Sequence, residues 1–220
     1  MDFLVRAAAP SDARSIVLLG REIDRDQIAD VASFRKLLER GAEPNVERLV
    51  ADSDGHIVAW APSGTYASGD GWFWIGVERS QRRRGVGGGL YARIEERLAG
   101  RGATRLETTP NDDDGRRFLI DRGFEVTNVV TNSELDPRTV EAAPPQPDSI
   151  RVAALAEASG QVDALFRLYS EARADVPSAT PRPEWTYDEW RRETIDSPLI
   201  DLDASVVVLE EDEPVALAWL

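Results

Sequence analysis

The sequence has no cysteine, a single histidine (His56) and a single lysine (Lys36) among its 220 residues. The absence of cysteine excludes disulfides, a thiolate metal site and a cysteine nucleophile. One histidine excludes a metal site built from several histidines, and any Ser-His-Asp triad would depend on that residue alone. One lysine nearly excludes catalytic lysine chemistry. We therefore expect neither a metal centre nor catalysis by cysteine or lysine.

Long apolar runs are also missing. No stretch approaches the ~18 residues of a membrane span, and the N-terminus lacks the basic start and apolar run of a signal peptide. The chain has 40 acidic and 26 basic residues, and its net charge of −14 disfavours nucleic acid and anionic membranes as partners. These features predict a cytoplasmic protein. The excess of arginine over lysine and the abundant alanine indicate a high-GC bacterial genome.

A proline-rich stretch, 136–148, divides the chain. It has no apolar periodicity and is typical of a semi-extended linker. Residues 1–147 hold 24 acidic and 20 basic residues, net −4, whereas residues 148–220 hold 16 and 6, net −10. We predict a first domain at 1–135, the linker, and a shorter, more acidic domain at 149–220.

The periodicity of the first domain predicts an α/β fold with a mixed sheet. The expected order is strand, two helices, three strands, helix, strand, helix and strand. The segments are Phe3–Ala8, a helix through Ile16 and Leu19, a helix through Phe34 that ends at Gly41, Glu47–Ala51, His56–Ala61, Trp72–Val77, 86–99, Thr104–Thr109, Asp112–Arg122 and Phe124–Val130.

The second domain is predicted to repeat the first half of this order. Its expected elements are a strand at 149–154, a helix through Val162 and Tyr169, a helix at 187–195 that begins with a capping box of Thr186 and Glu189, and strands at 205–210 and 214–220. Trp185, Tyr187 and Trp190 are expected in its core, with an acceptor or inter-domain groove as the alternative.

Two short sequence matches support this duplication. Val5-Arg6-Ala7-Ala8 recurs as Ile150-Arg151-Val152-Ala153, and Val50, Ala59 and Trp60 correspond to Leu209, Ala218 and Trp219. Matches in the same order on both sides of a linker favour a repeated fold, of which the second copy holds half. A half-sheet has an unpaired apolar edge, so we expect it to pair with the first domain, another copy or a missing segment.

The most informative segment runs from Trp72 to Leu90, where an apolar strand leads through an arginine-rich turn into glycines that begin a helix. Amides at a helix start are unpaired and lie at the positive end of the helix dipole, and glycines let a phosphate approach closely. The run Arg82-Arg83-Arg84-Gly85-Val86-Gly87-Gly88 therefore predicts a pyrophosphate site. It lacks the Gly-Lys-Ser/Thr of a P-loop, and Leu90 occupies the last glycine position of a Rossmann fingerprint. A solvated, glycine-rich helix start is the alternative.

This motif, the order of the elements around it, and Asn111 followed by Gly123-Phe124 resemble the GNAT superfamily of acyl-CoA-dependent N-acyltransferases over residues 1–135. The resemblance implies a GNAT-like sheet in which a bulged strand, Trp72–Val77, splays from Thr104–Thr109, and it implies acetyl-CoA as co-substrate. Pantetheine would bond to backbone near Ile75 and Val77, and Asn111 would lie near this arm. The pyrophosphate would lie on amides from Arg82 to Gly88. Tandem GNAT proteins are a pattern of the superfamily, which fits a second, partial unit.

Direct acyl transfer needs an oriented thioester, a deprotonated amine, a donor to the oxyanion and an acid for the leaving thiolate. The resemblance assigns the donor role to the N–H of Val77. In many relatives a tyrosine four residues before the glycine of Gly-Phe is the acid, but here that position is Leu119. Three substitutes are considered: Tyr91, Glu107 and His56. Their alternative interpretations are a core aromatic, a solvated carboxylate on a strand, and an exposed residue at a strand edge.

Asp112-Asp113-Asp114 complements a helix dipole and lacks the further ligands of a calcium loop, so no metal is expected. Two functions stay open. One is an N-acetyltransferase that acts on an amine by direct attack, and the other is a catalytically silent acyl-CoA-binding or structural domain. The acceptor would be a small-molecule or peptide amine, and the acidic balance favours a cationic one. A homodimer stays open, as does the question whether Leu220 is the natural end.

Overall fold

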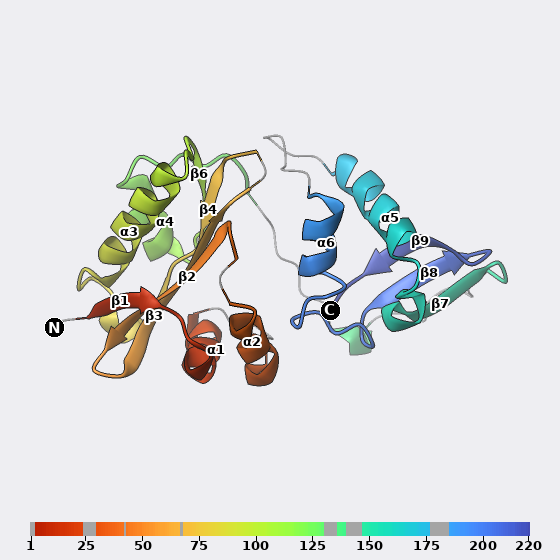
Figure 1. The fold of residues 1–220 in the computed structure, drawn as a ribbon, viewed down its shortest axis with the longest axis horizontal. Coiled ribbons are helices and arrows are strands. Elements are labelled where there is room, and N and C mark those ends of the chain that lie inside the picture. Colours follow the sequence, from red (N-terminus) through yellow and green to blue (C-terminus); the bar gives the residue numbers. More distant parts are fainter. Residues whose placement is uncertain are drawn as a thin grey trace. The chain divides into compact units, whose positions relative to one another are not determined.

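The computed structural model describes residues 3–23, 30–41, 43–66, 68–129, 136–139, 147–176 and 185–220. The chain divides into two compact units, Met1–Phe124 and Glu125–Leu220 (Figure 1). The predicted linker, 136–148, lies largely outside the described residues, and within it Pro137–Thr139 forms a short 3-10 turn. Each unit has its own sheet and its own core.

The first unit is built on a mixed sheet with strand order β1-β2-β3-β4-β6, and β5 pairs with β3 beyond β4. The strands are β1 (Leu4–Ala7), β2 (Val46–Ser53), β3 (His56–Thr65), β4 (Gly71–Phe73), β5 (Gly76–Val77) and β6 (Leu106–Glu107). The pairs are antiparallel except for β4 and β6, which are parallel. The predicted α/β fold with a mixed sheet is therefore confirmed.

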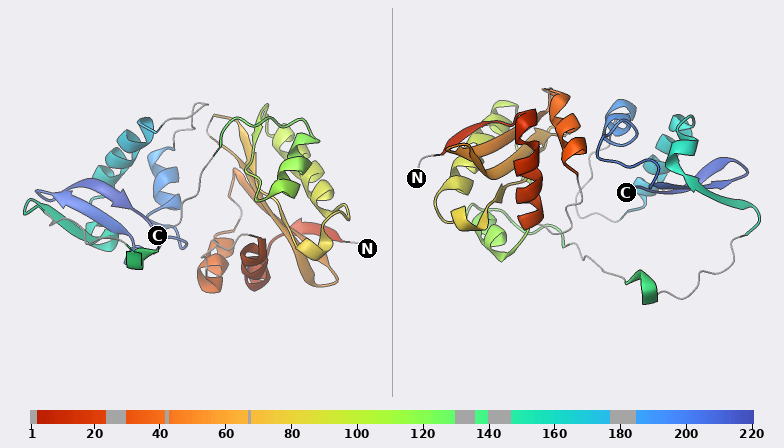
Figure 2. Two further views of the ribbon diagram at one scale, coloured as in Figure 1. Left: turned by 180° about the vertical axis from the view of Figure 1, so that it is seen from behind. Right: turned by 90° about the horizontal axis from the view of Figure 1, so that it is seen from below.

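Helices cover both faces of this sheet (Figure 2). On one face lie α1 (Ala13–Ile23) and α2 (Val31–Glu39), and on the other lie α3 (Val86–Gly100) and α4 (Asp113–Ile120). Side chains alternate along a strand, so β2 contributes to both cores: Val50 packs with α1 and α2, whereas Leu49 and Ala51 pack with α3.

The strand predicted at Trp72–Val77 is broken in the middle. β4 and β5 both pair with β3, but Trp74 and Ile75 between them belong to neither strand. β4 also pairs with β6, and the last pair in their ladder is Trp72 with Glu107. Beyond this pair, within the described residues, β5 continues along β3 without β6 beside it. The central strands thus splay apart, as the resemblance implied.

The last strand predicted for the first domain, Phe124–Val130, is wrong. Residues 124–129 form no strand, the side chains of Val126 and Val129 are 58% and 79% exposed, and residue 130 lies outside the described residues. A strand needs a paired edge, and β6, the expected neighbour, spans only two residues of the predicted Thr104–Thr109. Of residues 124–129, only Phe124 packs against the core that contains the buried side chains of α3.

The second unit holds a three-stranded antiparallel sheet, order β7-β8-β9, with two longer helices. The elements are β7 (Ile150–Ala154), α5 (Val162–Ala174), α6 (Tyr187–Glu193), β8 (Val206–Glu210) and β9 (Glu213–Ala218). The capping box of Thr186 and Glu189 is present at the start of α6. Trp190 is fully buried and packs against Phe166, and the half-buried Trp185 packs against the same core, as expected. Tyr187 is also half-buried, and its ring contacts those of Phe166 and Trp190.

The second unit repeats the order of elements of the first half of the first unit. Each runs from a strand through a 3-10 turn and two helices into an antiparallel hairpin. Arg6 lies opposite Val50 across β1 and β2, and Arg151 lies opposite Leu209 across β7 and β8. The first sequence match therefore falls on equivalent positions of the two sheets.

The second match is out of register. Val50 faces Trp60 across its hairpin, whereas Leu209 faces Pro214, so Trp219 does not take the place of Trp60. The reason is the length of the strands: β2 runs three residues past Val50 before the turn, but β8 runs one residue past Leu209. A shorter strand moves the turn and with it every later pair.

Candidate active site

Two backbone amides, one in β5 and one directly before it, face the opening between the splayed strands. Trp74 donates its N–H to the Pro62 carbonyl at 3.0 Å, and Glu78 donates to the Val58 carbonyl at 2.9 Å, so both face β3. Successive residues of a strand direct their N–H groups to opposite edges. The amides of Ile75 and Val77 therefore point away from β3, toward the edge beside which β6 no longer runs.

The turn after β5 leads directly into α3. Arg79–Gln81 form a 3-10 turn, Arg82 is extended, and Arg83 and Gly85 take φ angles of 63° and 87°. The left-handed conformation at Gly85 is one that glycine adopts without steric cost. Gly89 donates its N–H to the Gly85 carbonyl at 2.9 Å and so closes the first turn of the helix. The amides before it, in the first turn of α3, have no partner within the helix.

The protein's own packing does not require glycine at 87 or 88. A Cβ at Gly87 would lie 3.7 Å from both the Phe118 ring and Val77 Cγ2, and a Cβ at Gly88 would meet only Arg122 Nη2 at 3.6 Å. These are ordinary contact distances. Glycine inside a helix costs about 1 kcal/mol relative to alanine. The fold itself therefore does not need glycine at either position.

The three predicted arginines of the turn differ in their surroundings. Arg82 binds Asp112 through Nη1 at 2.6 Å and donates from Nε to the Val77 carbonyl at 3.3 Å, which ties the turn to the start of α4. Burial opposes ionisation of Asp112, but the Gly115 amide and Arg82 together hold its pKa below the usual value. Arg83 and Arg84 are exposed. Much of the charge of Arg82 is therefore already balanced by the protein.

Asn111 lies across the opening from the broken strand. Its Oδ1 accepts a hydrogen bond from Trp74 Nε1 at 3.0 Å. Because an indole N–H can only donate, the oxygen of the amide must be the atom that faces Trp74. The NH₂ group of Asn111 is thereby turned away from the indole and keeps its donors for another acceptor.

The predicted catalytic side chains lie in different environments. Tyr91 is in the core and donates its hydroxyl to Glu95 at 2.9 Å; burial, followed by Glu95, raises its pKa to about 12. Glu107 lies at the last β4–β6 pair, where the strands begin to part, and forms a 2.9 Å ion pair with Arg105. Leu119, at the position of the usual tyrosine, packs against the α3 core.

His56 is the first residue of β3 and lies next to Glu78, the residue that follows β5. Its Nε2 is 2.8 Å from Glu78 Oε2, and its side chain is 68% exposed. The Ser80 hydroxyl and His56 lower the pKa of Glu78. Thus the exposed strand-edge position expected for His56 is the one observed.

Sequence reasoning did not single out Arg122, which the structure places beside the first turn of α3. Its guanidinium lies 3.6 Å from the centroid of the Phe118 ring and donates from Nη1 to the Phe118 carbonyl at 2.9 Å. The signal available in the sequence was weak: an aromatic residue four positions before an arginine at a helix end, where the two side chains share one face.

Neither a metal cluster nor a membrane helix is found in the part of the chain that the structure describes. Asp112 acts as the N-cap of α4 and accepts a hydrogen bond from the Gly115 amide at 2.8 Å. Asp113 and Asp114 occupy the first turn, where negative charge complements the helix dipole. The aspartate run thus has a structural explanation.

The first unit is an α/β domain with a glycine-rich helix start beside two parted strands. Residues 18–124 match the model of the acetyltransferase (GNAT) family, and they form a GNAT acetyltransferase domain. A search of the curated proteins gives no match.

Solved structures share this fold at low sequence identity. An acetyltransferase of Trypanosoma brucei is 17% identical, with 61% of this chain and 100% of that chain covered and a TM-score of 0.50. A transcriptional regulator of Bacillus halodurans C-125 is 19% identical, with the same coverage and a TM-score of 0.51. The aminoglycoside N-acetyltransferase AAC(6')-Iy in complex with CoA is 18% identical, with 61% and 95% covered and a TM-score of 0.48.

Proposed function

We propose that this protein is an N-acetyltransferase that transfers the acetyl group of acetyl-CoA to an amine by direct attack. The observation that carries the proposal is the pair of backbone amides, at Ile75 and Val77, that face the opening next to a glycine-rich helix start. A thioester carbonyl in the opening and a pyrophosphate on the helix would use these donors together.

The co-substrate would be held mainly by backbone. Amides between Arg82 and Gly88 would take the pyrophosphate, with Gly87 and Gly88 allowing close approach and Arg83 and Arg84 adding positive charge. Pantetheine would follow β5 past Val77 and Ile75. The NH₂ group of Asn111, turned from Trp74, would donate to a carbonyl of this arm.

Catalysis would need little from side chains. The amine attacks the thioester carbonyl, the N–H of Val77 stabilises the oxyanion, and the carbon–sulfur bond breaks to release CoA thiolate. Glu107 lies on the sheet face opposite its neighbour Leu106, which packs toward α3. From that face its carboxylate would accept the proton of the amine through a water. Leu119 has no proton to give, so water protonates the thiolate. We assign Tyr91 to the core because its hydroxyl donates to Glu95.

The second candidate function is a silent acyl-CoA-binding or structural domain, which Leu119 favours because it removes the usual acid. Both functions include binding, so binding is tested first. Calorimetry with acetyl-CoA should give saturable binding to the unaltered protein and to Gly87→Ala, whose methyl fits at ordinary contact distances, but not to Gly87→Glu, which puts a carboxylate at the anion site. Thermal melts check that both variants fold. Unchanged affinity in Gly87→Glu would refute the site.

Turnover then separates the two functions. An amine panel should release free CoA thiol from acetyl-CoA, and we expect cationic amines of small molecules or peptides to be the better acceptors because the chain is acidic. Tight binding without turnover on any amine would favour the silent domain. Sedimentation of the same preparations would show whether the protein is a homodimer.

A further inference from the structure

We propose that Arg122, at the end of α4, binds the pyrophosphate of the co-substrate and is the cation that supplements the amides of α3. This inference rests on the proposed function. Its first support is the position of the side chain. Nη2 of Arg122 lies 3.6 Å from the point that a Cβ on Gly88 would occupy, in the first turn of α3. The guanidinium therefore lies beside the unpaired amides of that turn.

The second support is that this guanidinium is held in place. It lies over the Phe118 ring, with its central carbon 3.6 Å from the ring centroid, and Nη1 donates to the Phe118 carbonyl at 2.9 Å. The Phe118 ring itself lies 3.7 Å from the point that a Cβ on Gly87 would occupy, so it packs beside the first turn of α3. An arginine fixed in this way loses little conformational entropy when it binds, and its planar fork matches two phosphate oxygens.

The third support is the balance of charge around the turn. Arg82 is bound by Asp112 at 2.6 Å, with Asp114 a further 3.9 Å contact. In the described ranges no carboxylate forms an ion pair with Arg122. Its guanidinium also lies over the face of the neutral Tyr91 ring, 5.4 Å from the ring centroid. The charge of Arg122 is thus available to an anion from outside the protein, while that of Arg82 is largely used.

The ligand follows from the same geometry. Amides at the start of a helix bind phosphate groups. The guanidinium of Arg122, which lies beside such amides, would therefore contact the same phosphate groups. We therefore assign Arg122 to the diphosphate bridge, which acetyl-CoA and 3'-dephospho-acetyl-CoA share and S-acetyl-pantetheine lacks. Arg82, in contrast, links the turn to α4.

The test measures the Kd of these three compounds by calorimetry for the unaltered protein, Arg122→Met, Arg122→Lys and the control Arg117→Met. Arg117 lies in the last turn of the same helix and is exposed. Loss of a charge-assisted hydrogen bond should raise the Kd of acetyl-CoA about 10- to 100-fold in Arg122→Met. Arg122→Lys keeps the charge without the fork and should be intermediate. Arg117→Met should change the Kd less than about twofold.

The three compounds separate the outcomes. We expect Arg122→Met to lose as much affinity for 3'-dephospho-acetyl-CoA as for acetyl-CoA, and to lose no affinity for S-acetyl-pantetheine. An Arg122→Met protein that melts normally and binds acetyl-CoA like the unaltered protein would overturn the inference and leave the proposed function standing. A loss confined to the compound with a 3'-phosphate would also overturn it. Unaltered protein that binds no acetyl-CoA would overturn both.

Discussion

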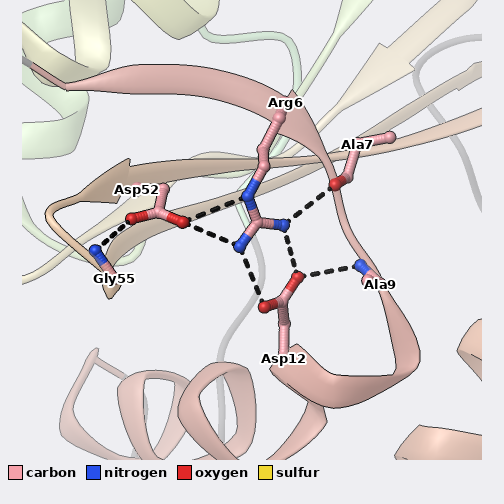
Figure 3. A network of polar contacts seen from close by, with 6 residues as sticks. All are labelled: Arg6, Ala7, Ala9, Asp12, Asp52 and Gly55. Carbon is pink, nitrogen blue, oxygen red and sulfur yellow. Dashed lines mark hydrogen bonds and ion pairs between the residues drawn. The ribbon is translucent and has the colours of Figure 1, made fainter.

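Arg6 offers a stringent test of how the first unit is held together, because it bridges three segments (Figure 3). From β1 it binds Asp12, before α1, through Nη1 at 2.6 Å and Nη2 at 3.0 Å, and it binds Asp52, at the end of β2, through Nε at 3.1 Å and Nη2 at 2.8 Å. The side chain of Asp12 is 10% exposed and also accepts from the Ala9 amide at 2.8 Å. Removing Arg6 would leave this carboxylate buried without its partner.

The magnitude follows from that burial. Breaking a buried ion pair costs about 3–5 kcal/mol, but the Arg6 side chain is 31% exposed and solvent screens part of the loss. We therefore expect Arg6→Met to lower the free energy of unfolding of the first unit by about 2–3 kcal/mol, which lowers its Tm by roughly 8–15 °C. Calorimetry and urea unfolding measure both quantities.

The second unit supplies a matched control. Arg151, at the equivalent strand position, contacts Glu157 at 3.4 Å and Asp212 at 3.8 Å, and these side chains are 60% and 86% exposed. Exposed pairs contribute less than about 1 kcal/mol, so Arg151→Met should change the stability of its unit very little. Equal losses in the two variants would refute the reasoning from burial.

The pH dependence adds an independent check. Hydrogen bonds from Arg6 lower the pKa values of Asp12 and Asp52 in the folded state. A lowered carboxyl pKa stabilises the fold above the unfolded value, about 4, and this stabilisation is lost as pH falls through the folded value. The stability difference between Arg6→Met and the unaltered protein should therefore be constant from pH 6 to 8 and shrink below about pH 4.

Three further predictions concern the site. Trp74→Phe, which removes the donor that orients Asn111, should raise the KM for acetyl-CoA about 3- to 10-fold, whereas Trp72→Phe should not; equal effects would contradict a positioning role. Glu107→Gln should lower kcat about 100-fold or more and leave the KM for acetyl-CoA unchanged. The control Asp70→Asn, which removes the other ion-pair partner of Arg105, should keep kcat. A Glu107→Gln protein with normal kcat would show that Glu107 is not the base. Tyr91→Phe should keep kcat and lose about 1 kcal/mol of stability, and a large loss of kcat would contradict its place in the core.

Sequence reasoning succeeded where local chemistry decides structure. The start of α3 at Val86 and the capping box of Thr186 are specified by residues within a few positions of each other, and both are found as expected. The splay of the central strands was implied by the family resemblance. It was not predicted from the residues themselves, because the run Trp72–Val77 breaks at Trp74 and Ile75, two apolar residues that are typical of a continuous strand.

It failed where structure depends on partners distant in sequence. The strand expected at Phe124–Val130 has suitable residues, but a strand forms only if another strand lies beside it, and β6 is too short to provide one. The pairing of Arg82 with Asp112 and the stacking of Arg122 on Phe118 likewise depend on how α3 and α4 pack. The sequence predicted one pyrophosphate site over Arg82–Gly88, and only the packing shows that Arg82 is bound by Asp112 whereas Arg83 and Arg84 are exposed.

Acetyl transfer at the glycine-rich site is tested most directly by the release of CoA thiol from acetyl-CoA in the presence of amines, measured side by side for the unaltered protein and Gly87→Glu. We expect amine-dependent release by the unaltered protein and loss of that release in Gly87→Glu at the same acetyl-CoA concentration. Equal rates in the two proteins, or no release by the unaltered protein with any amine despite bound acetyl-CoA, would contradict it.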